Sequence, residues 1–325
     1  MNISVFQQAT YYKQSFFQKL FKQFPEENAV VELNNLLATK EIQSITPNDI
    51  QKIEHKYGLN LHKEFALNLE EFYAVYLNSC LLDNVLSDNE VDDLRHLKSL
   101  LGLNDVVINK LHDKIGGAIY EANFKEVIKD GRLGKKEKSF IEKLQNDLRL
   151  DESLANKISE EVRGAYLNNF IKRAIADDML SPEEEKELDL ICKSLNVKLD
   201  LDQKTKDHFK KIKLFWIIEN GELPICKVDI NLQKNEVCYY TDFIEWEELR
   251  RGSWTVIDRG NVFFTNKRIL FMGESKNTNI RLEKILSCTI HAHGVEVDKD
   301  AGKVPILIPR KDIDIMGRIL KRLIR

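Results

Sequence analysis

Acidic residues recur at a fixed spacing in the middle of this chain, in a pattern that would suit a divalent cation. Asp130, Gly131 and Glu137 stand as they would in the second half of a calcium-binding loop of about twelve residues. The first half of such a loop needs more oxygen ligands, and one of those positions is apolar in every copy: Leu81, Ile128 or Ile175. We therefore interpret the turns as capped helix connections and expect no metal or other cofactor.

Other patterns that carry chemistry are incomplete. His291 and His293 share one face of a predicted strand, but no third zinc ligand lies in sequence reach. The chain has neither a Gly-x-x-x-x-Gly-Lys-Ser/Thr nor a Gly-x-Gly-x-x-Gly loop for phosphate, and no Gly-x-Ser-x-Gly nucleophile elbow. These gaps favour a protein that is not an enzyme, with an unrecognised acidic active site as the alternative.

Basic residues are concentrated between positions 250 and 268. They would form one positive patch if the strands of this region bring them together, and that patch would attract phosphate or an acidic partner. The alternative is that they are solvated turn residues, with Arg268 bracing its own turn. The candidate binding residues of this region are Arg250, Arg251, Arg259, Lys267 and Arg268.

Residues 1–25 are unusually rich in aromatic side chains. Four apolar residues lie four positions apart, which predicts an amphipathic helix: Tyr12, Phe16, Leu20 and Phe24. One interpretation is a membrane-surface anchor or a partner-docking helix, with Phe17 and Phe21 as contact residues. The preferred interpretation is a helix packed on the following domain, because aromatic stripes usually belong to a core.

The segment 71–211 contains one helical unit three times in succession. A fixed period of this size predicts supersecondary units that stack and bury one another's apolar faces. Residues 45–53 look like a shorter, degenerate fourth copy. The positions that repeat at 47 residues include Asp83, Asp130 and Asp177; Leu86, Leu133 and Leu180; Glu90, Glu137 and Glu184; and Leu97, Leu144 and Ile191.

Each unit predicts a helix, a tight acidic turn and a second helix with an N-terminal cap. Ser87 precedes Glu90 by three positions, and Ser181 precedes Glu184 in the same way, which is the spacing of a capping box. Gly134 replaces the serine in the middle copy, which we expect to weaken that cap only slightly.

Bulk properties exclude several classes of protein. A formal net charge of −3 gives no argument for nucleic-acid binding. The chain contains no run of about 18 apolar residues, so no membrane span is predicted. The five cysteines are scattered without a Cys-x-x-Cys pair, which favours a reduced, cytoplasmic chain. The N-terminus lacks a signal-peptide pattern. We expect a cytoplasmic protein, membrane-peripheral if the N-terminal helix binds a bilayer.

The period of the apolar residues changes near Gly221. Short β-branched and aromatic runs follow it, separated by turn clusters, and one amphipathic helix closes the chain. The predicted fold class is a multidomain α+β protein. The expected division is an N-terminal helical segment at 1–70, helical repeats at 71–220 and a strand-rich domain at 221–325.

The repeats resemble the TerB family, helical modules linked to tellurite resistance and to bacterial stress-response or phage-defence loci. They are also similar to the helical repeats of the chloroplast inner-envelope translocon protein. The residues that carry both resemblances are the acidic turn, the leucine before the cap and the capping glutamate in each copy.

The strand-rich part resembles bacterial PH-like and GRAM-like domains. Residues 260–271, 280–285 and 221–224 and the closing helix carry this resemblance. It implies a split seven-stranded β-barrel capped by a helix, which binds proteins or lipids and does not catalyse. The first strand-to-strand loop lacks the dense Lys/Arg cluster that grips inositol phosphates in lipid-binding members.

Together these patterns predict a non-enzymatic scaffold or adaptor that binds protein partners, in the setting of a bacterial stress-response or phage-defence complex. The alternative is a peripheral membrane protein that binds lipid through the PH-like part and the N-terminal helix. No nucleic-acid partner is expected.

Overall fold

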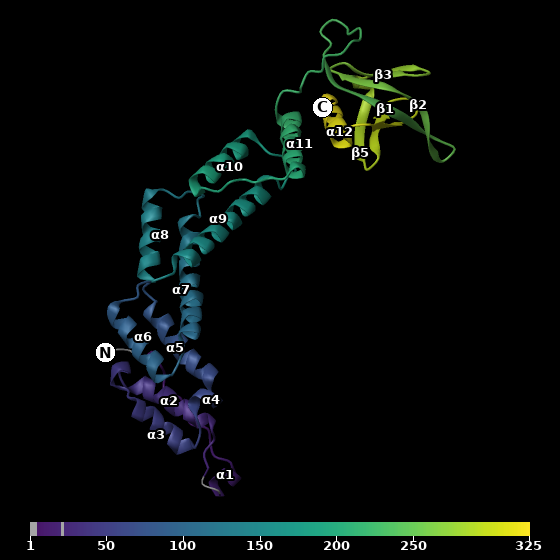
Figure 1. Ribbon diagram of the computed structural model, residues 1–325. Helices are drawn as coiled ribbons and strands as arrows, with labels where there is room; N and C mark the ends of the chain where they lie inside the picture. The colour runs from purple at the N-terminus through teal and green to yellow at the C-terminus, as the bar shows by residue number, and fades with distance from the viewer. Residues whose placement is uncertain (1–4, 21–22) are drawn as a thin grey trace. The chain divides into compact units, whose positions relative to one another are not determined.

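The computed structural model describes residues 5–20 and 23–325, except for the side chain of Phe17 (Figure 1). Its internal contacts divide the chain into two compact units. One contains Met1–Asn168 with Leu190–Lys198, and the other contains Asn169–Asp189 with Leu199–Arg325. The first unit is helical, and the second contains a β-sheet.

Helices occupy the chain up to residue 220, and the predicted repeat is visible in where they begin. The second helix of each copy begins at Asp88, Lys135 or Pro182, which keeps the period of 47 residues found in the sequence. The helices are α1 (Phe16–Leu20), α2 (Glu27–Thr39), α3 (Pro47–Tyr57), α4 (Leu61–Glu64), α5 (Ala66–Cys80), α6 (Asp88–Leu100), α7 (Asp105–Val127), α8 (Lys135–Asp147), α9 (Glu152–Ala174), α10 (Pro182–Leu195) and α11 (Gln203–Asn220).

The acidic turns between paired helices form for a local reason. In each turn, Oδ1 of the aspartate accepts a hydrogen bond from the N–H two residues later, over 2.9–3.0 Å. The residue directly after each aspartate has a left-handed backbone, a conformation that Asn, Gly and Asp adopt more readily than other residues. The aspartates are Asp83, Asp130 and Asp177, and the left-handed residues are Asn84, Gly131 and Asp178.

The helix after each turn begins with the expected cap. Glu90 returns to the N–H of Ser87 at 2.8 Å, and Glu184 returns to the N–H of Ser181 at 2.9 Å. A Cβ on Gly134 would lie 2.6 Å from Oε2 of Glu137, so this glutamate also folds back over its cap residue. The carboxylates of the turns and caps are thus used by the backbone. Among the described residues, no group of three or more His, Cys, Asp and Glu side chains gathers as a metal site would require.

The N-terminal prediction was wrong in its secondary structure. Residues 7–15 are extended, and the only helix before Pro25 in the described chain is α1, five residues long. Phe6 is buried, whereas Tyr12 and Phe16 have 62% and 75% of their surface exposed. Phe21 and the side chain of Phe17 lie outside the described residues. The extended form is stabilised by asparagine side chains of α2, which supply hydrogen bonds that a helix would otherwise make for itself.

A half-buried histidine, His112, gives the helical unit a testable dependence on pH. Nε2 of His112 in α7 lies 3.0 Å from the hydroxyl oxygen of Tyr73 in α5. Burial lowers the pKa of His112, and the charge of Asp113 opposes this only in part. Because the pKa is lower in the folded chain than in the unfolded one, unfolding takes up a proton at acid pH.

We expect the stability of the helical unit to be full above about pH 6.5 and to fall as the pH drops from there towards the lowered pKa of His112. Urea unfolding followed by helical circular dichroism at about pH 7.5 and about pH 5.5 measures this loss. The His112→Gln variant, which has no titrating ring, should show a smaller loss over this interval. An equal loss in both proteins would rule out His112 as its source.

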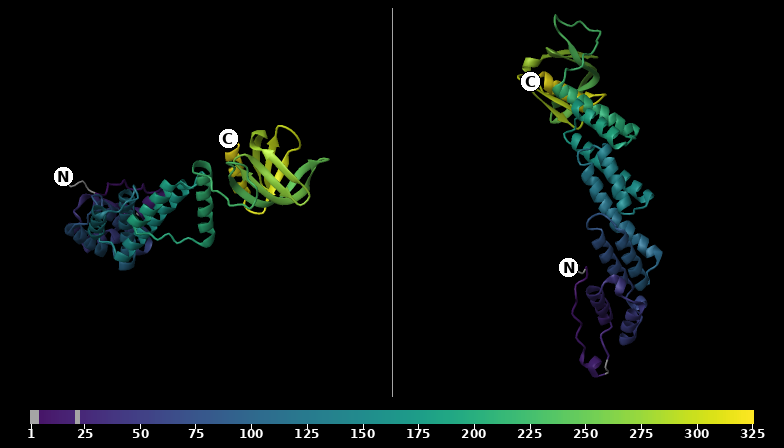
Figure 2. Two further views of the ribbon diagram at one scale, coloured as in Figure 1. Left: turned by 90° about the horizontal axis from the view of Figure 1, so that it is seen from above. Right: turned by 90° about the vertical axis from the view of Figure 1, so that its left-hand side faces the viewer.

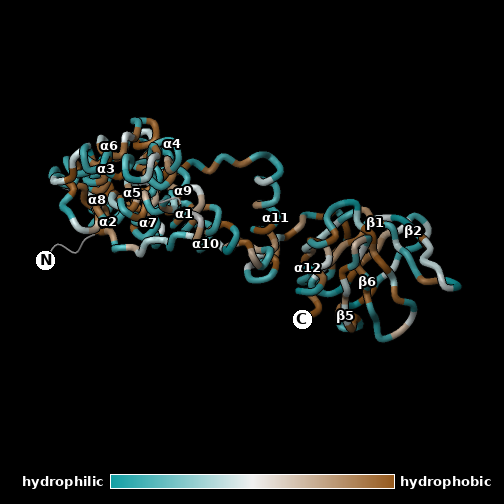
Figure 3. The backbone as a smooth tube through the Cα atoms, turned by 90° about the horizontal axis from the view of Figure 1, so that it is seen from below, coloured by the Kyte–Doolittle hydropathy of each residue, from teal (hydrophilic) through white to brown (hydrophobic). Residues whose placement is uncertain are grey.

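The second unit is built on an antiparallel seven-stranded sheet with the order β4-β3-β2-β1-β7-β6-β5. Alternate residues of the strands point into one core, and Figure 3 shows the resulting hydrophobic stretches. The strands are β1 (Cys238–Arg250), β2 (Ser253–Thr265), β3 (Arg268–Gly273), β4 (Asn277–Arg281), β5 (Ile285–His291), β6 (Gly294–Lys299) and β7 (Pro305–Pro309).

The closed split barrel expected from the sequence is not what forms. Within the described residues, β4 and β5 do not pair, although only the short 3-10 helix Leu282–Lys284 separates them in the chain. They are the two edges of an open sheet. The α+β class is confirmed, and so is the closing helix, α12 (Ile313–Leu323), which packs its apolar face on the sheet through Met316, Ile319 and Leu320.

Helix α11 packs against the sheet, although in the chain it directly follows the repeat helices. Ile218 of α11 is fully buried in the core of the sheet. Arg322 of α12 donates hydrogen bonds to the carbonyl oxygens of Ile218 and Gly221, over 2.6 and 2.9 Å. The division into 1–70, 71–220 and 221–325 stays a prediction, but a cut at 221 would remove Ile218 from this core.

Candidate interaction surfaces

The basic residues predicted to form one patch are distributed along the whole length of β2. Arg250 and Arg251 lie at the β1–β2 turn, Arg259 lies within β2, and Lys267 and Arg268 lie at the β2–β3 turn. Strand β2 has 13 residues and therefore spans about 40 Å. The structure does not bring the five residues together on one small ligand.

Arg268 is used inside the unit. Its Nε and Nη2 donate to the two carboxylate oxygens of Glu236, over 2.8 and 3.1 Å. The side chain of Glu236 is fully buried and that of Arg268 is 13% exposed. Thr265 Oγ1 donates to the same carboxylate at 2.8 Å. Burial would raise the pKa of Glu236, but Arg268, the N–H of Gln233 and Thr265 together hold that pKa below its usual value.

Two further basic residues of the β2 region have partners within the sheet unit. Nζ of Lys267 donates to the carbonyl oxygen of Lys234 at 2.7 Å. Nε of Arg259 donates to Oε1 of Glu245 at 2.8 Å. Beside this pair, in a shallow depression on β1, β2 and β7, the guanidinium of Arg310 lies 4.0 Å from the ring centre of Phe243. Glu245 in this depression offsets part of the positive charge.

The β1–β2 hairpin continues beyond its neighbours in the sheet. Strand β7 pairs with β1 only as far as Glu248, and β3 pairs with β2 only from Gly260 onward. Residues 249–256 are here named the β-arm. Among the described residues, Leu249 and Arg250 pair only with Trp254 and Ser253, and Thr255 and Val256 pair only with Glu248 and Glu247 of β1. The β-arm projects from the sheet in Figure 1. Its turn is made by Arg251 and Gly252, which both have a positive φ.

The β-arm exposes large apolar side chains. Leu249 and Trp254 are direct cross-strand partners, so they lie on the same face of the hairpin. Val256, two residues along β2, points to that face as well. The exposed fractions are 51% for Leu249, 41% for Trp254 and 37% for Val256.

The charges around the β-arm are mixed. Arg250 and Lys303 each lie 3.6 Å from the carboxylate of Glu248. Within the described part of the chain, Arg251 has no ion-pair partner. The two arginines were predicted from the sequence, whereas Leu249, Trp254 and Val256 were not. The available signal was Arg251-Gly252, a turn placed in the middle of an unusually long β run.

Residues 68–193 match the family model of Tic110, described as a chloroplast envelope transporter. The match covers the helical repeats from α5 to α10 and less than half of the chain. It agrees with the similarity to the inner-envelope translocon repeats noted from the sequence. The search of the curated proteins found no match to the chain.

The Tic110 match corrects the TerB interpretation of the repeats, which was wrong. Acidic turns and capping boxes solve a local problem, the connection of two helices, so they do not separate one helical family from another. No PH-like family model matches the strand-rich part either. Within residues 260–271, which carried that resemblance, Thr265, Asn266 and Arg268 have a structural use: all three bind the segment 235–237.

Among the described residues, no helix is both long enough and apolar enough to cross a bilayer, and this includes the helices of the Tic110-like region.

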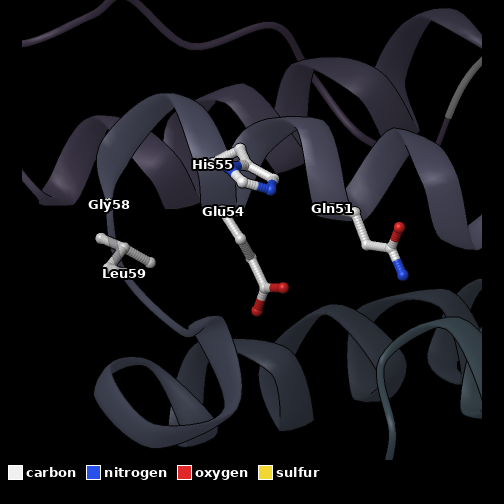
Figure 4. Close-up of a pocket in the computed structure, with 5 residues that line it drawn as sticks. All are labelled: Gln51, Glu54, His55, Gly58 and Leu59. Atoms are coloured by element: carbon white, nitrogen blue, oxygen red, sulfur yellow. The ribbon is translucent and has the colours of Figure 1, made fainter.

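A depression at the end of α3 is lined by polar and turn residues (Figure 4). One carboxylate oxygen of Glu54 there accepts the N–H of Leu61 at 2.9 Å, which fixes the α3–α4 turn. Glu54 therefore has a structural use.

Proposed function

We propose that this protein is a non-enzymatic adaptor that holds a partner protein on its β-arm. The observation that carries the proposal is the gathering of Trp254, Leu249 and Val256 on one exposed face, beside Arg250 and Arg251. Tryptophan and arginine dominate the energetics of protein interfaces, because they combine a large contact area with directed polar groups.

The chemistry of the β-arm defines the partner. Its apolar face fits a hydrophobic pocket, and Arg251, which has no ion-pair partner in the described chain, fits a carboxylate at the rim of that pocket. Glu247 and Glu248 offset two of the three cations near the β-arm, Arg250, Arg251 and Lys303. This partial balance favours a protein surface over an anionic lipid surface, which would attract a clearly positive arm.

The helical repeats supply the second part of the adaptor. Their likeness to the chloroplast envelope transporter family supports an envelope-associated assembly as the setting in which the partner is held. Stacked helical units present extended surfaces, which suits an adaptor whose two units engage different components.

The test compares three forms of the tagged full-length chain in affinity purification from its native cell: the natural chain, Leu249→Ala/Trp254→Ala, and Leu286→Ala. Leu286 lies in β5 and is 64% exposed, so it is a matched control for the loss of surface apolar area. The β-arm variant should recover at least about thirtyfold less of the partner, which corresponds to a loss of about 2 kcal/mol for one hot spot.

Two outcomes would contradict the proposal. One is equal recovery of every partner by the natural chain and the β-arm variant. The other is sedimentation of the purified chain with protein-free anionic vesicles at low and at high salt, abolished by the same two substitutions, which would make the β-arm a lipid-binding element.

A further inference from the structure

The extended N-terminal segment is bound to α2 by asparagine side chains in a repeated way. Oδ1 of Asn35 accepts the N–H of Ala9 at 2.7 Å, and its Nδ2 donates to the carbonyl oxygen of the same residue at 2.9 Å. Asn28 repeats this arrangement with Tyr12, over 2.7 and 3.0 Å. Each carboxamide thus pairs with a backbone N–H and C=O as a neighbouring strand would.

The spacing of the asparagines matches the spacing of the bound backbone. Asn28 and Asn35 are seven residues apart, about two helical turns, so they stand on the same face of α2. Nδ2 of Asn34 adds a bond to the carbonyl oxygen of Gln7 at 2.7 Å. The helix therefore recognises residues 7–12 through their main chain. Figure 2 shows this segment, in purple, running alongside the first helices.

Only one side chain of the segment is anchored. Phe6 is 6% exposed and contacts two rings of α5, with ring centres 5.9 Å from Phe72 and 6.3 Å from Tyr76. The side chains of residues 7–13 are all exposed. The contacts that hold the segment thus need an extended backbone and one aromatic anchor, and they do not depend on the other side chains.

We propose that this face, formed by Asn28, Asn34, Asn35, Phe72 and Tyr76 and here named the asparagine face, is a binding site for extended peptides that carry an aromatic anchor. The chain's own residues 6–12 fill the site. A partner protein with a similar exposed segment binds by replacing them. This site lies in the helical unit and does not depend on the β-arm.

The test releases the segment after the chain has folded. A protease recognition sequence is inserted between Lys13 and Gln14 of the full-length chain, where the backbone is extended. After cleavage, the N-terminal fragment should stay with the body of the protein. A fluorescent synthetic peptide of residues 5–13 should replace this fragment in a saturable manner. Fluorescence anisotropy measures the binding of the peptide.

Two matched pairs identify the contacts. Asn28→Ala/Asn35→Ala should weaken peptide binding at least about tenfold, whereas Asn78→Ala, at an exposed position of α5, should leave it unchanged. A peptide N-methylated at Ala9 should lose binding, and one N-methylated at Gln8 should keep it. In the described chain, only the first of these N–H groups donates to a side chain of α2. If the double variant does not fold, the two N-methylated peptides still test the contacts on the natural chain.

The proposal is overturned if the cleaved fragment leaves and the fluorescent peptide fails to bind. It is also overturned if the peptide binds equally well with either N-methyl group, because the asparagines would then have no part in recognition. A Phe6→Ala peptide should lose binding, and a peptide altered at Gln7 and Thr10 should keep it. This pair of results would support Phe6 as the aromatic anchor.

Discussion

Replacing Arg268 with methionine should destabilise the sheet unit by about 3–5 kcal/mol. The substitution keeps most of the aliphatic stem but removes the charge opposite Glu236, whose side chain is fully buried. A buried carboxylate without its cation must either stay charged at high cost or take up a proton. Urea unfolding of the natural chain and the variant measures the difference.

The matched control for Arg268 is its neighbour, Lys267→Met. Lys267 is exposed and bonds only to a carbonyl oxygen through Nζ, so this change should stay within about 0.5 kcal/mol. If the two variants were equally stable, Arg268 would be a free surface cation, as the patch hypothesis assumed.

Glu236 also gives the natural chain a dependence on pH. Its folded pKa lies below its usual value, despite burial, because of Arg268 and the neighbouring donors. The stabilisation is therefore complete above the unfolded pKa of about 4.3 and is lost as the pH falls through the lowered folded pKa. In Arg268→Met this acid-sensitive contribution should be smaller, because its main cation is gone.

Truncating the same core position in each repeat should cost about 2–5 kcal/mol in every copy. Leu97, Leu144 and Ile191 occur one period apart and have 0%, 4% and 1% of their surface exposed. Changing each to alanine removes buried methyl groups and leaves a cavity between packed helices. Chemical unfolding of the three single variants measures the losses.

Leu190→Ala provides the matched control for this series. Leu190 is adjacent to Ile191 on α10 but is 50% exposed, so its truncation should change the free energy of unfolding by about 0.5 kcal/mol or less. A core variant that behaved like Leu190→Ala would show that the copies are not structurally equivalent.

The repeats were predictable because the signals that build them are local. The aspartate turns, the left-handed residues and the capping boxes are each complete within a few positions of sequence, and they form as expected at Ser87 and Ser181. The N-terminus was not predictable in this way. Its helical spacing is real, but Asn28 and Asn35, which lie 16 and 26 residues from their partners, stabilise the extended form.

The candidate site was only half predictable. Arg250 and Arg251 were found as charges. The long β run around Arg251-Gly252 indicates a hairpin, but the exposure of Trp254 depends on where β7 and β3 end, which that run does not show. The role of Arg268 was also hidden, since its partner Glu236 lies 32 residues away in the chain. Sheet closure depends likewise on the pairing of β4 with β5, which are edges in the structure.

Cross-linking at the tip of the β-arm in the native cell would show whether the β-arm holds a partner protein. A photoreactive phenylalanine analogue is placed at position 254 of the full-length chain, and in a second chain at position 286 as the exposed control. We expect a protein adduct at 254 that is absent at 286 and lost when Leu249 is changed to alanine. Adducts that are the same at both positions, or that form at 254 only with lipid, would contradict the proposed adaptor function.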